Sequence, residues 1–465
     1  MSAIATASPP TASGSIGNWL DRHREILPSL PGACLPWLDD LRERAIRRFA
    51  DIGWPSSRLE NWRHTSLLFM EHEDFAPTGA AGPARTTGLG RFVEDLRGGE
   101  EGHWLVFLDG RYAAELSQPG ALPQGAEIGP LSRELQARPG TLEKAFGDID
   151  DAEAPVALNA AFAADGAVIR LAAGVDLRAP VHLLFIALTA GAAVHVRNLV
   201  SAGAGARATV MEHFVSFGEA AAVGGAEGAA SVGSLTNVVT RIDAGVDARI
   251  GHVKLQQESA GTVHLASIDA VQARGSWFGS HSLAFGARLC RNDIGTRFDG
   301  ENCEALLNGL YHVDGKRHVD HHTRIEHAHP RGVSREYYRG ILADTARGVF
   351  TGRIRVAPGA VRTDAVQRTD SLLLSPRAET DARPELEIYA DDVKCAHGAT
   401  VGQLDEDALF YLRSRGLDEG DARNVLIFAF AAEALARIES EPLRRRAAAA
   451  IRSLLPGGEA MEVNW

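Results

Sequence analysis

Cys395 and His397 stand two residues apart in the segment 391–416. If this segment is an extended strand, residues two apart project from the same face, so a thiol and an imidazole would lie side by side. Both groups bind iron and other transition metals, and a thiolate can also carry sulfur. The spacing equally fits the end of a half-buried strand, where the cysteine packs as a small apolar residue and the histidine is simply satisfied by polar neighbours.

A cluster of histidines between residues 312 and 329 is a second candidate site. Six of the 17 histidines fall in this window, together with three carboxylates. On strands, His327 and His329 could share a face and bind a metal, as could Asp320 and His322. The alternative is solvated polar surface, because His-Glu-x-x-His and similar ligand motifs are absent from the sequence. The cluster consists of His312, His318, His321, His322, His327 and His329 with Asp314, Asp320 and Glu326.

Composition excludes several functions. With 48 basic and 60 acidic residues the net charge is -12, so no general positive field attracts nucleic acid or an anionic membrane. The chain has neither an apolar run long enough to span a bilayer nor a secretory leader, which predicts a cytoplasmic protein. A phosphate-binding Gly-x-x-x-x-Gly-Lys-[Ser/Thr] motif is also missing, so we expect no ATPase activity of its own. The four cysteines favour a reducing compartment over a disulfide framework; they are Cys34, Cys290, Cys303 and Cys395.

Sequence patterns divide the chain into four parts. Between residues 156 and 400, short segments such as 193–197 and 248–255 alternate between apolar and polar residues, with glycine turns at uneven intervals between them. This is irregular for a propeller, and without a convincing helix it predicts a β-helix or a long β-sandwich. The predicted parts are a disordered lead-in at 1–14, a helical or mixed domain at 15–150, a β-helix at 151–400 and a helical domain at 401–465.

The N-terminal part begins with two predicted helices. Ser15 is expected to cap the first, and the second runs from Leu35 to a stop at Gly53. Residues 58–67 mix charges with a tryptophan, and this segment either docks a partner or packs in a local core. Residues 104–108 predict a strand that turns at 109–110. The apolar stripe of the second helix comprises Leu38, Leu41, Ala45, Ile46 and Phe49.

The C-terminal part predicts further helices. Asp405 is expected to cap one helix, which ends before Gly416, and Asp418 with Asp421 opens the next. The apolar face of that second helix forms either a core or a docking surface. Its members are Val425, Leu426, Phe428, Ala429, Ala432 and Leu435.

At residues 383–405 the sequence resembles the SufB/SufD family, the scaffold subunits of the SUF iron-sulfur cluster assembly machinery. The resemblance is dense over the C-terminal third, and residues 58–67 resemble SufD rather than the longer opening of SufB. Further matching stretches are 319–323, 334–342, 348–354, 363–367, 372–375 and 410–416.

This resemblance implies a right-handed parallel β-helix between helical N- and C-terminal domains. It also implies a noncatalytic scaffold that pairs with SufB through the β-helices and binds the ATPase SufC through its C-terminal helices. On this basis Phe410, Tyr411, Arg413 and Arg415 are expected to contact SufC. The isolated chain could form a homodimer instead.

The resemblance further implies that a transient iron-sulfur cluster forms at the SufB interface, with no permanently bound cofactor. His397 is the matching position for the histidine implicated in that step and is expected to bind metal, with Cys395 beside it. A reduced flavin is associated with the SUF complex, although this chain has no flavin motif. The alternative functions are a carbohydrate-active enzyme on a β-solenoid and a metalloenzyme built on the histidine cluster.

Overall fold

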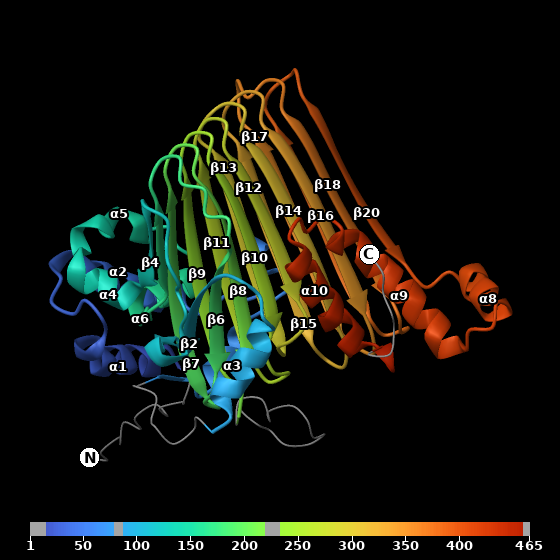
Figure 1. Cartoon of the computed structure of the whole chain (residues 1–465), viewed down its shortest axis with the longest axis horizontal. Coiled ribbons are helices and arrows are strands. Elements are labelled where there is room, and N and C mark those ends of the chain that lie inside the picture. The colour runs from blue at the N-terminus through green and yellow to red at the C-terminus, as the bar shows by residue number, and fades with distance from the viewer. Residues whose placement is uncertain (1–14, 79–86, 219–232, 459–465) are drawn as a thin grey trace, which may run out of the picture.

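The computed structural model describes residues 15–78, 87–218 and 233–458, so the lead-in predicted at 1–14 lies outside the described residues. The chain winds into a β-solenoid in which successive strands alternate between two sheets that face each other (Figure 1). The strands within each sheet pair in parallel, apart from an antiparallel pair at the N-terminal end of each sheet. The prediction of a mainly β chain with a β-helix core and helices at both ends is confirmed.

Sheet A has the strand order β19-β17-β15-β13-β11-β9-β7-β5-β4, with β1 beside β7. Its strands are β1 (Ala76–Pro77), β4 (Ala126–Pro130), β5 (Ala167–Leu171), β7 (Ala192–Ala202), β9 (Leu235–Ala244), β11 (Val263–Gln272), β13 (Leu289–Phe298), β15 (His318–His327), β17 (Arg347–Val356) and β19 (Glu379–Ile388).

Sheet B has the order β20-β18-β16-β14-β12-β10-β8-β6-β2-β3. Its strands are β2 (His103–Leu108), β3 (Arg111–Tyr112), β6 (Val181–Ala187), β8 (Arg207–Ser216), β10 (Arg249–Gln257), β12 (Trp277–Ala284), β14 (Glu304–Val313), β16 (Val333–Leu342), β18 (Asp364–Leu373) and β20 (Lys394–Gly402).

Helices cover the outer faces of both sheets. N-terminal helices pack on the early strands of sheet A, and α9 and α10 pack across the outer face of sheet B (Figure 1). The α-helices are α1 (Ile16–Ile26), α2 (Pro36–Ile52), α3 (Leu89–Arg97), α4 (Leu131–Ala137), α5 (Glu143–Phe146), α6 (Ala154–Phe162), α8 (Glu406–Ser414), α9 (Glu419–Leu435) and α10 (Glu441–Leu454). Short 3-10 turns occur at Leu27–Ser29, Glu60–Trp62, Leu68–His72, Ala114–Leu116 and Pro139–Thr141.

Both faces of most strands are buried, and this determines where the core lies. On β10, Ile250 points into the space between the sheets, whereas Val253 and Leu255 point outward and pack under the C-terminal helices. The same arrangement recurs on the other sheet, where Val263 and Leu265 contact the N-terminal helices. The protein therefore has an interior core and an additional apolar layer on each outer face.

The caps and turns lie where the sequence predicts them. The Ser15 side chain accepts the Asn18 N–H, Gly53 ends α2 with φ +64°, and the Asp405 and Asp418 carboxylates cap α8 and α9. The predicted stripe of α2 is buried throughout.

One expectation is wrong, and another is confirmed only in part. Helix α6 falls inside the region expected to be free of helices; its residues are almost wholly apolar and therefore lack a helical stripe. Of the predicted face of α9, Phe428 and Leu435 are buried as expected, but Val425 and Ala429 are exposed. The residues Ile427, Ala431 and Ala434, which were not predicted, are buried instead. None of the helices in the described ranges is long and apolar enough to cross a membrane.

Candidate functional site

The last rung of the solenoid, formed by β19 and β20, leaves one edge of each sheet open. In the described part of the chain β19 pairs only with β17 and β20 only with β18, so the outer backbone groups of both strands lack a strand partner. Three large apolar side chains are exposed there: Ile388 (41%), Tyr389 (58%) and Val401 (55%). An unpaired edge flanked by apolar side chains is a surface on which another chain can add.

Cys395 and His397 lie together on β20, as their spacing predicts. Cys395 pairs in register with Ala365, which is fully buried, and packs against the interior cluster. Because side chains alternate along a strand, His397 belongs to the same inward face of β20. The imidazole is nevertheless exposed, since it lies on the terminal strand of its sheet.

The surroundings of the Cys395 thiol disfavour the thiolate. Burial raises the pKa of Cys395, and the nearby Asp364 carboxylate raises it further. The thiol is therefore protonated at neutral pH in the isolated chain, which makes it a weak nucleophile and a weak metal ligand. A cation or a metal brought by a partner would favour the thiolate.

The histidine cluster at 312–329 does not converge on one point. His321 and His327 pair in register with interior residues, whereas His318 and His322 lie on the outer face of sheet A. Asp320 and His322 do share a face, with Oδ1 and Nε2 3.2 Å apart. Across residues 15–78, 87–218 and 233–458 no three His, Cys, Asp or Glu side chains are grouped to hold a metal ion, so the metal-site hypothesis for this cluster finds no support.

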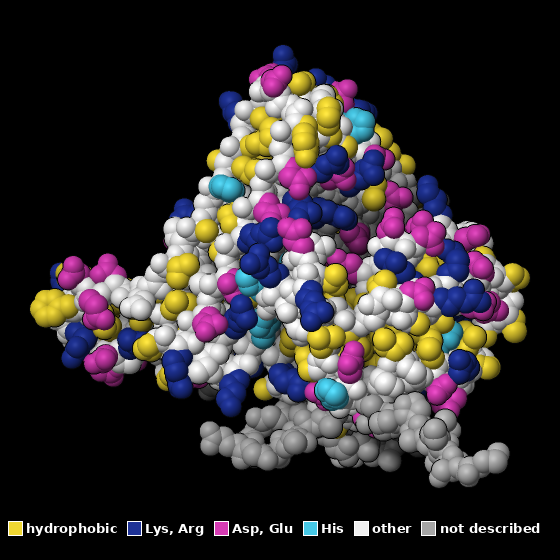
Figure 2. All heavy atoms as spheres, turned by 180° about the vertical axis from the view of Figure 1, so that it is seen from behind, with side chains coloured by type: hydrophobic (Ala, Val, Ile, Leu, Met, Phe, Trp, Pro, Cys, Tyr) yellow, Lys and Arg dark blue, Asp and Glu magenta, His cyan; other side chains and the backbone are white. Residues whose placement is uncertain are grey.

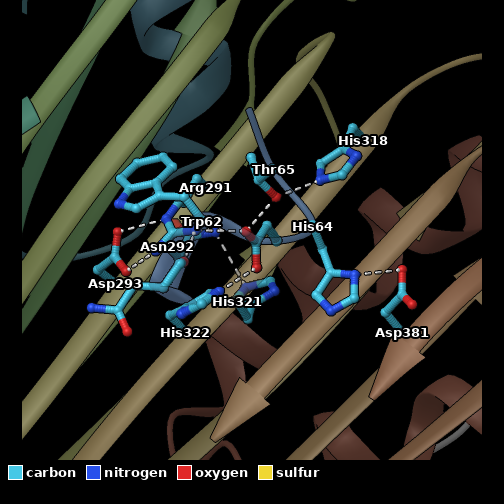
Figure 3. Close-up of polar contacts among 12 residues, drawn as sticks. Trp62, His64, Thr65, Arg291, Asn292, Asp293, His318, His321, His322 and Asp381 are labelled. Carbon is cyan, nitrogen blue, oxygen red and sulfur yellow. Dashed lines mark hydrogen bonds and ion pairs between the residues drawn. The ribbon is translucent and has the colours of Figure 1, made fainter. Parts of the chain in front are cut away.

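The N-terminal segment 58–67 is instead anchored to sheet A, and Figure 3 shows Thr65 of this segment beside His318. Thr65 Oγ1 donates to Asp320 Oδ2 at 2.5 Å and lies 2.8 Å from His318 Nε2. Trp62 is only 2% exposed; its Nε1 donates to Glu153, and the Arg291 guanidinium stacks on its ring at 3.7 Å. Of the two interpretations of this segment, a tryptophan packed in a local core is the one that the contacts support.

Asp320 is the centre of this contact. Burial alone would raise its pKa, but His322 and the Arg291 guanidinium outweigh burial and hold the pKa of the carboxyl well below its usual range. Arg291 Nη1 donates to Asp320 Oδ2 at 2.9 Å and its Nη2 to Asp293 at 2.8 Å. Asp320 is thus a buried, ionised carboxylate at neutral pH, paired with the Arg291 guanidinium.

The same N-terminal segment reaches the last rung. Arg383 of β19 donates to Glu60 at 2.8 Å, and His64 Nδ1 lies 3.4 Å from the carboxylate of Asp381. Residues more than 300 positions apart in the sequence therefore meet at the edge strand of sheet A. Sequence reasoning missed this contact, because alternating charges on a strand give no sign of which distant segment covers them.

Helix α8 projects away from the solenoid beyond the last rung (Figure 1). Phe410 is 73% exposed and Tyr411 is 55% exposed, and Figure 2 shows hydrophobic side chains on this projecting part. Arg415 stacks on the Tyr411 ring at 5.2 Å and donates to its hydroxyl at 2.9 Å, while Arg413 lies 3.7 Å from Glu419. The helix thus exposes apolar and cationic side chains together.

The sequence also did not predict the polar side chains that lie inside the solenoid. Lys254 is buried between the sheets and donates to Asn292 Oδ1 at 2.7 Å. Glu258 accepts from Thr236 at 2.6 Å and lies 2.6 Å from His264 Nδ1. In an alternating sequence, polar residues at every second position suggest a face exposed to solvent. Here the helices cover the other, apolar face of the strands, so the polar face is the one that lies inside the solenoid.

Comparison with known proteins agrees with this architecture. Residues 185–430 match the family model described as "SUF system FeS cluster assembly, SufBD core domain", and residues 18–183 match "SufBD protein N-terminal region". The chain belongs to the SufBD family. Both the resemblance carried by residues 383–405 and the β-solenoid agree with this assignment.

Individual SufBD relatives match along most of their length. The chain is 32% identical over 423 residues to the iron-sulfur cluster assembly protein SufD of Escherichia coli, covering 90% of this chain and 93% of that protein. It is 30% identical over 408 residues to SufBD family protein slr0076 of Synechocystis, covering 87% and 88%. It is 28% identical over 441 residues to the chloroplastic protein ABCI7 of Arabidopsis thaliana, covering 93% and 89%. The predicted similarity to SufD is confirmed.

Proposed function

We propose that this chain is a noncatalytic scaffold subunit of a SUF complex. Its last rung pairs with the β-helix of SufB, its C-terminal helices bind the ATPase SufC, and a nascent iron-sulfur cluster forms at the paired rung. The observation that carries the proposal is the open rung, in which an unpaired strand edge bears Cys395 and His397 on its inward face.

The number of donors supports a site shared between two chains. Tetrahedral metal centres commonly use four ligands, and the rung offers one thiol and one imidazole. A partner strand added to β20 would bring its own side chains opposite these two. It would also cover Tyr389 and Val401, so the apolar surface that is exposed in the isolated chain becomes part of an interface.

SufC binding is assigned to α8 on the basis of exposure. Phe410 and Tyr411 are large side chains with little contact to the rest of the chain, and aromatic residues of this kind are the usual anchors of interfaces. Arg413 and Arg415 surround them with positive charge, which would favour an acidic patch on the partner. The apolar face of α9 is used within the chain itself, so α8 remains the docking element.

The test is His397→Ala in a strain that expresses the chain with SufB and SufC. We expect the three proteins to co-purify in normal amounts, because an exposed imidazole contributes little to folding, while the cluster content of the anaerobic complex falls to background. His72→Ala serves as the matched control, since His72 is also exposed but lies on the short turn Leu68–His72. A His397→Ala complex with wild-type cluster content would remove the residue from the mechanism, and loss of assembly would make its role structural.

A further inference from the structure

Behind His397, the interior of sheet B contains two polar residues in the same register. The ladder runs from Leu307 through Glu336 and Gln367 to His397, one residue from each successive strand. Glu336 is 0% exposed and Gln367 is 1% exposed. The ladder therefore changes from an apolar residue in the core to buried polar residues directly beneath the open rung.

Gln367 and Glu336 are joined to each other. Gln367 Nε2 donates to Glu336 Oε2 at 2.5 Å. Gly352, on the facing strand β17, leaves the space for this side chain, because a Cβ there would overlap Gln367 Nε2 and the Phe350 ring. The Gln367 amide thus extends across the interior toward sheet A. Because Glu336 accepts from the nitrogen of this amide, the amide oxygen points elsewhere.

The opposite end of the amide is free. Gln367 Oε1 is buried without a hydrogen-bond partner in the described part of the chain. Leaving a buried acceptor unpaired destabilises the fold, so such a group is expected to have a partner in the functional state. In-register neighbours on adjacent strands lie about 5 Å apart, and the neighbour toward the open edge is His397.

We propose that Gln367 is the positioning residue for His397. Its amide oxygen accepts one ring N–H of His397, and Glu336 holds the amide in the orientation that presents this oxygen. The accepted proton fixes the tautomer of the imidazole, so the other ring nitrogen carries a lone pair and faces the rung where a metal would bind. This inference rests on the proposed function of His397 at the rung.

The carboxyl suits this orienting role. Burial raises the pKa of Glu336 to about 7. In either protonation state it retains an oxygen that accepts from the amide, so the orientation of Gln367 is kept on both sides of neutral pH. Thr323 and Tyr338 are the other polar groups that face it.

Gln367→Met and Gln367→Glu test the proposal in the full chain. Methionine keeps the length and removes the acceptor. Glutamate keeps an acceptor oxygen toward His397, and a protonated Glu336 can donate to its other oxygen and hold it in the same orientation. The first measurement is histidine-selective nitrogen NMR of the full-length chain, with the His397 signals identified by their loss in His397→Ala. We expect a single tautomer of His397 in the wild type and in Gln367→Glu, and two exchanging tautomers in Gln367→Met.

The second measurement is cluster content of the anaerobic complex with SufB and SufC. Gln367→Met should assemble normally and lose at least 10-fold in cluster content, and Gln367→Glu should retain most of it. Gln272→Met is the matched control, because Gln272 is equally buried inside the solenoid but lies on β11, far from the last rung in strand order. Equal losses in Gln367→Met and Gln272→Met would overturn the proposal in favour of a general packing effect.

The outcomes separate this inference from the proposed function. If His397→Ala abolishes the cluster while Gln367→Met leaves both cluster content and the tautomer unchanged, the inference fails and the proposed function stands. If the NMR result is as expected but His397→Ala leaves cluster content at the wild-type level, the proposed function fails instead. If Gln367→Met does not fold, the wild-type spectrum decides, since two exchanging tautomers there would refute the hydrogen bond.

Discussion

Asp320→Asn should release the N-terminal segment 58–67 from the solenoid while leaving the solenoid folded. The carboxylate is fully buried and accepts from Thr65 at 2.5 Å and from Arg291 at 2.9 Å. Hydrogen bonds to a charged group contribute about 1.5 to 3 kcal/mol each, and breaking a buried ion pair costs about 3 to 5 kcal/mol. Arg291 keeps its second partner, Asp293. We therefore expect Asp320→Asn to destabilise the docked segment by about 3 kcal/mol, the low end of the range for a buried ion pair.

Hydrogen exchange measured on peptides covering 58–67 is the appropriate assay, because local opening exposes those amides without global unfolding. A loss of about 3 kcal/mol corresponds to roughly 100-fold faster exchange, since each 1.4 kcal/mol is a factor of ten. Asp299→Asn is the control: its carboxylate forms an exposed pair with Arg297 at 3.4 Å, and such pairs contribute at most about 1 kcal/mol.

The effect should depend on pH in one direction. The pKa of Asp320 in the folded chain lies well below the value of about 3.9 in an unfolded chain. A carboxyl of this kind stabilises the fold above the unfolded pKa and loses that contribution as pH falls toward the folded pKa. The difference in exchange rate at residues 58–67 between the wild type and Asp320→Asn should therefore be fully present at pH 7 and become smaller below about pH 4. Exchange at 58–67 that rises less than threefold at pH 7 would refute the anchor.

Two further predictions concern the rung and α8. Cys395→Ser should reduce cluster content less than His397→Ala does, because the thiol is protonated in the isolated chain and serine keeps its size; a cluster loss equal to that of His397→Ala would contradict this order. Phe410→Ala should weaken SufC binding by about 1 to 4 kcal/mol, measured by calorimetry, without changing pairing with SufB. Ile52→Ala, at an exposed apolar residue of α2, is the control. Unchanged SufC affinity in Phe410→Ala would show that α8 is not the docking element.

The sequence predicted the β-solenoid and the terminal helices because their signals are local. Caps at Ser15, Asp405 and Asp418 depend on hydrogen bonds within three residues, and strands show as alternation. Alternation does not tell which face is the interior when both are buried. On β10 the polar residues His252 and Lys254 face inward beside Ile250, whereas the apolar Val253 and Leu255 face outward.

The candidate site was predictable only in part for a related reason. Cys395 and His397 lie on one strand, so their common face follows from spacing alone. Gln367 and Glu336 lie on two earlier strands. Their position behind His397 depends on the register between these strands, which is determined by the number of residues in each turn of the solenoid. Nothing local to those residues indicates that register. The buried face of α9 was predicted only in part, because a helix that is apolar nearly all round has no distinct stripe.

The two strands of the last rung differ in the side-chain contacts that other parts of the chain make with them, and this difference affects how a partner could bind there. Strand β19 is braced from outside by the N-terminal segment through Glu60 and His64. Strand β20 is exposed along almost its whole length; beyond its ladder with β18, Thr400 donates to Asp370 at 2.5 Å. The strand bearing Cys395 and His397 is thus the less constrained of the two. A partner strand added to β20 would therefore order the strand that bears His397 in the same step that completes the donor set, so assembly of the complex and completion of the site would be one event.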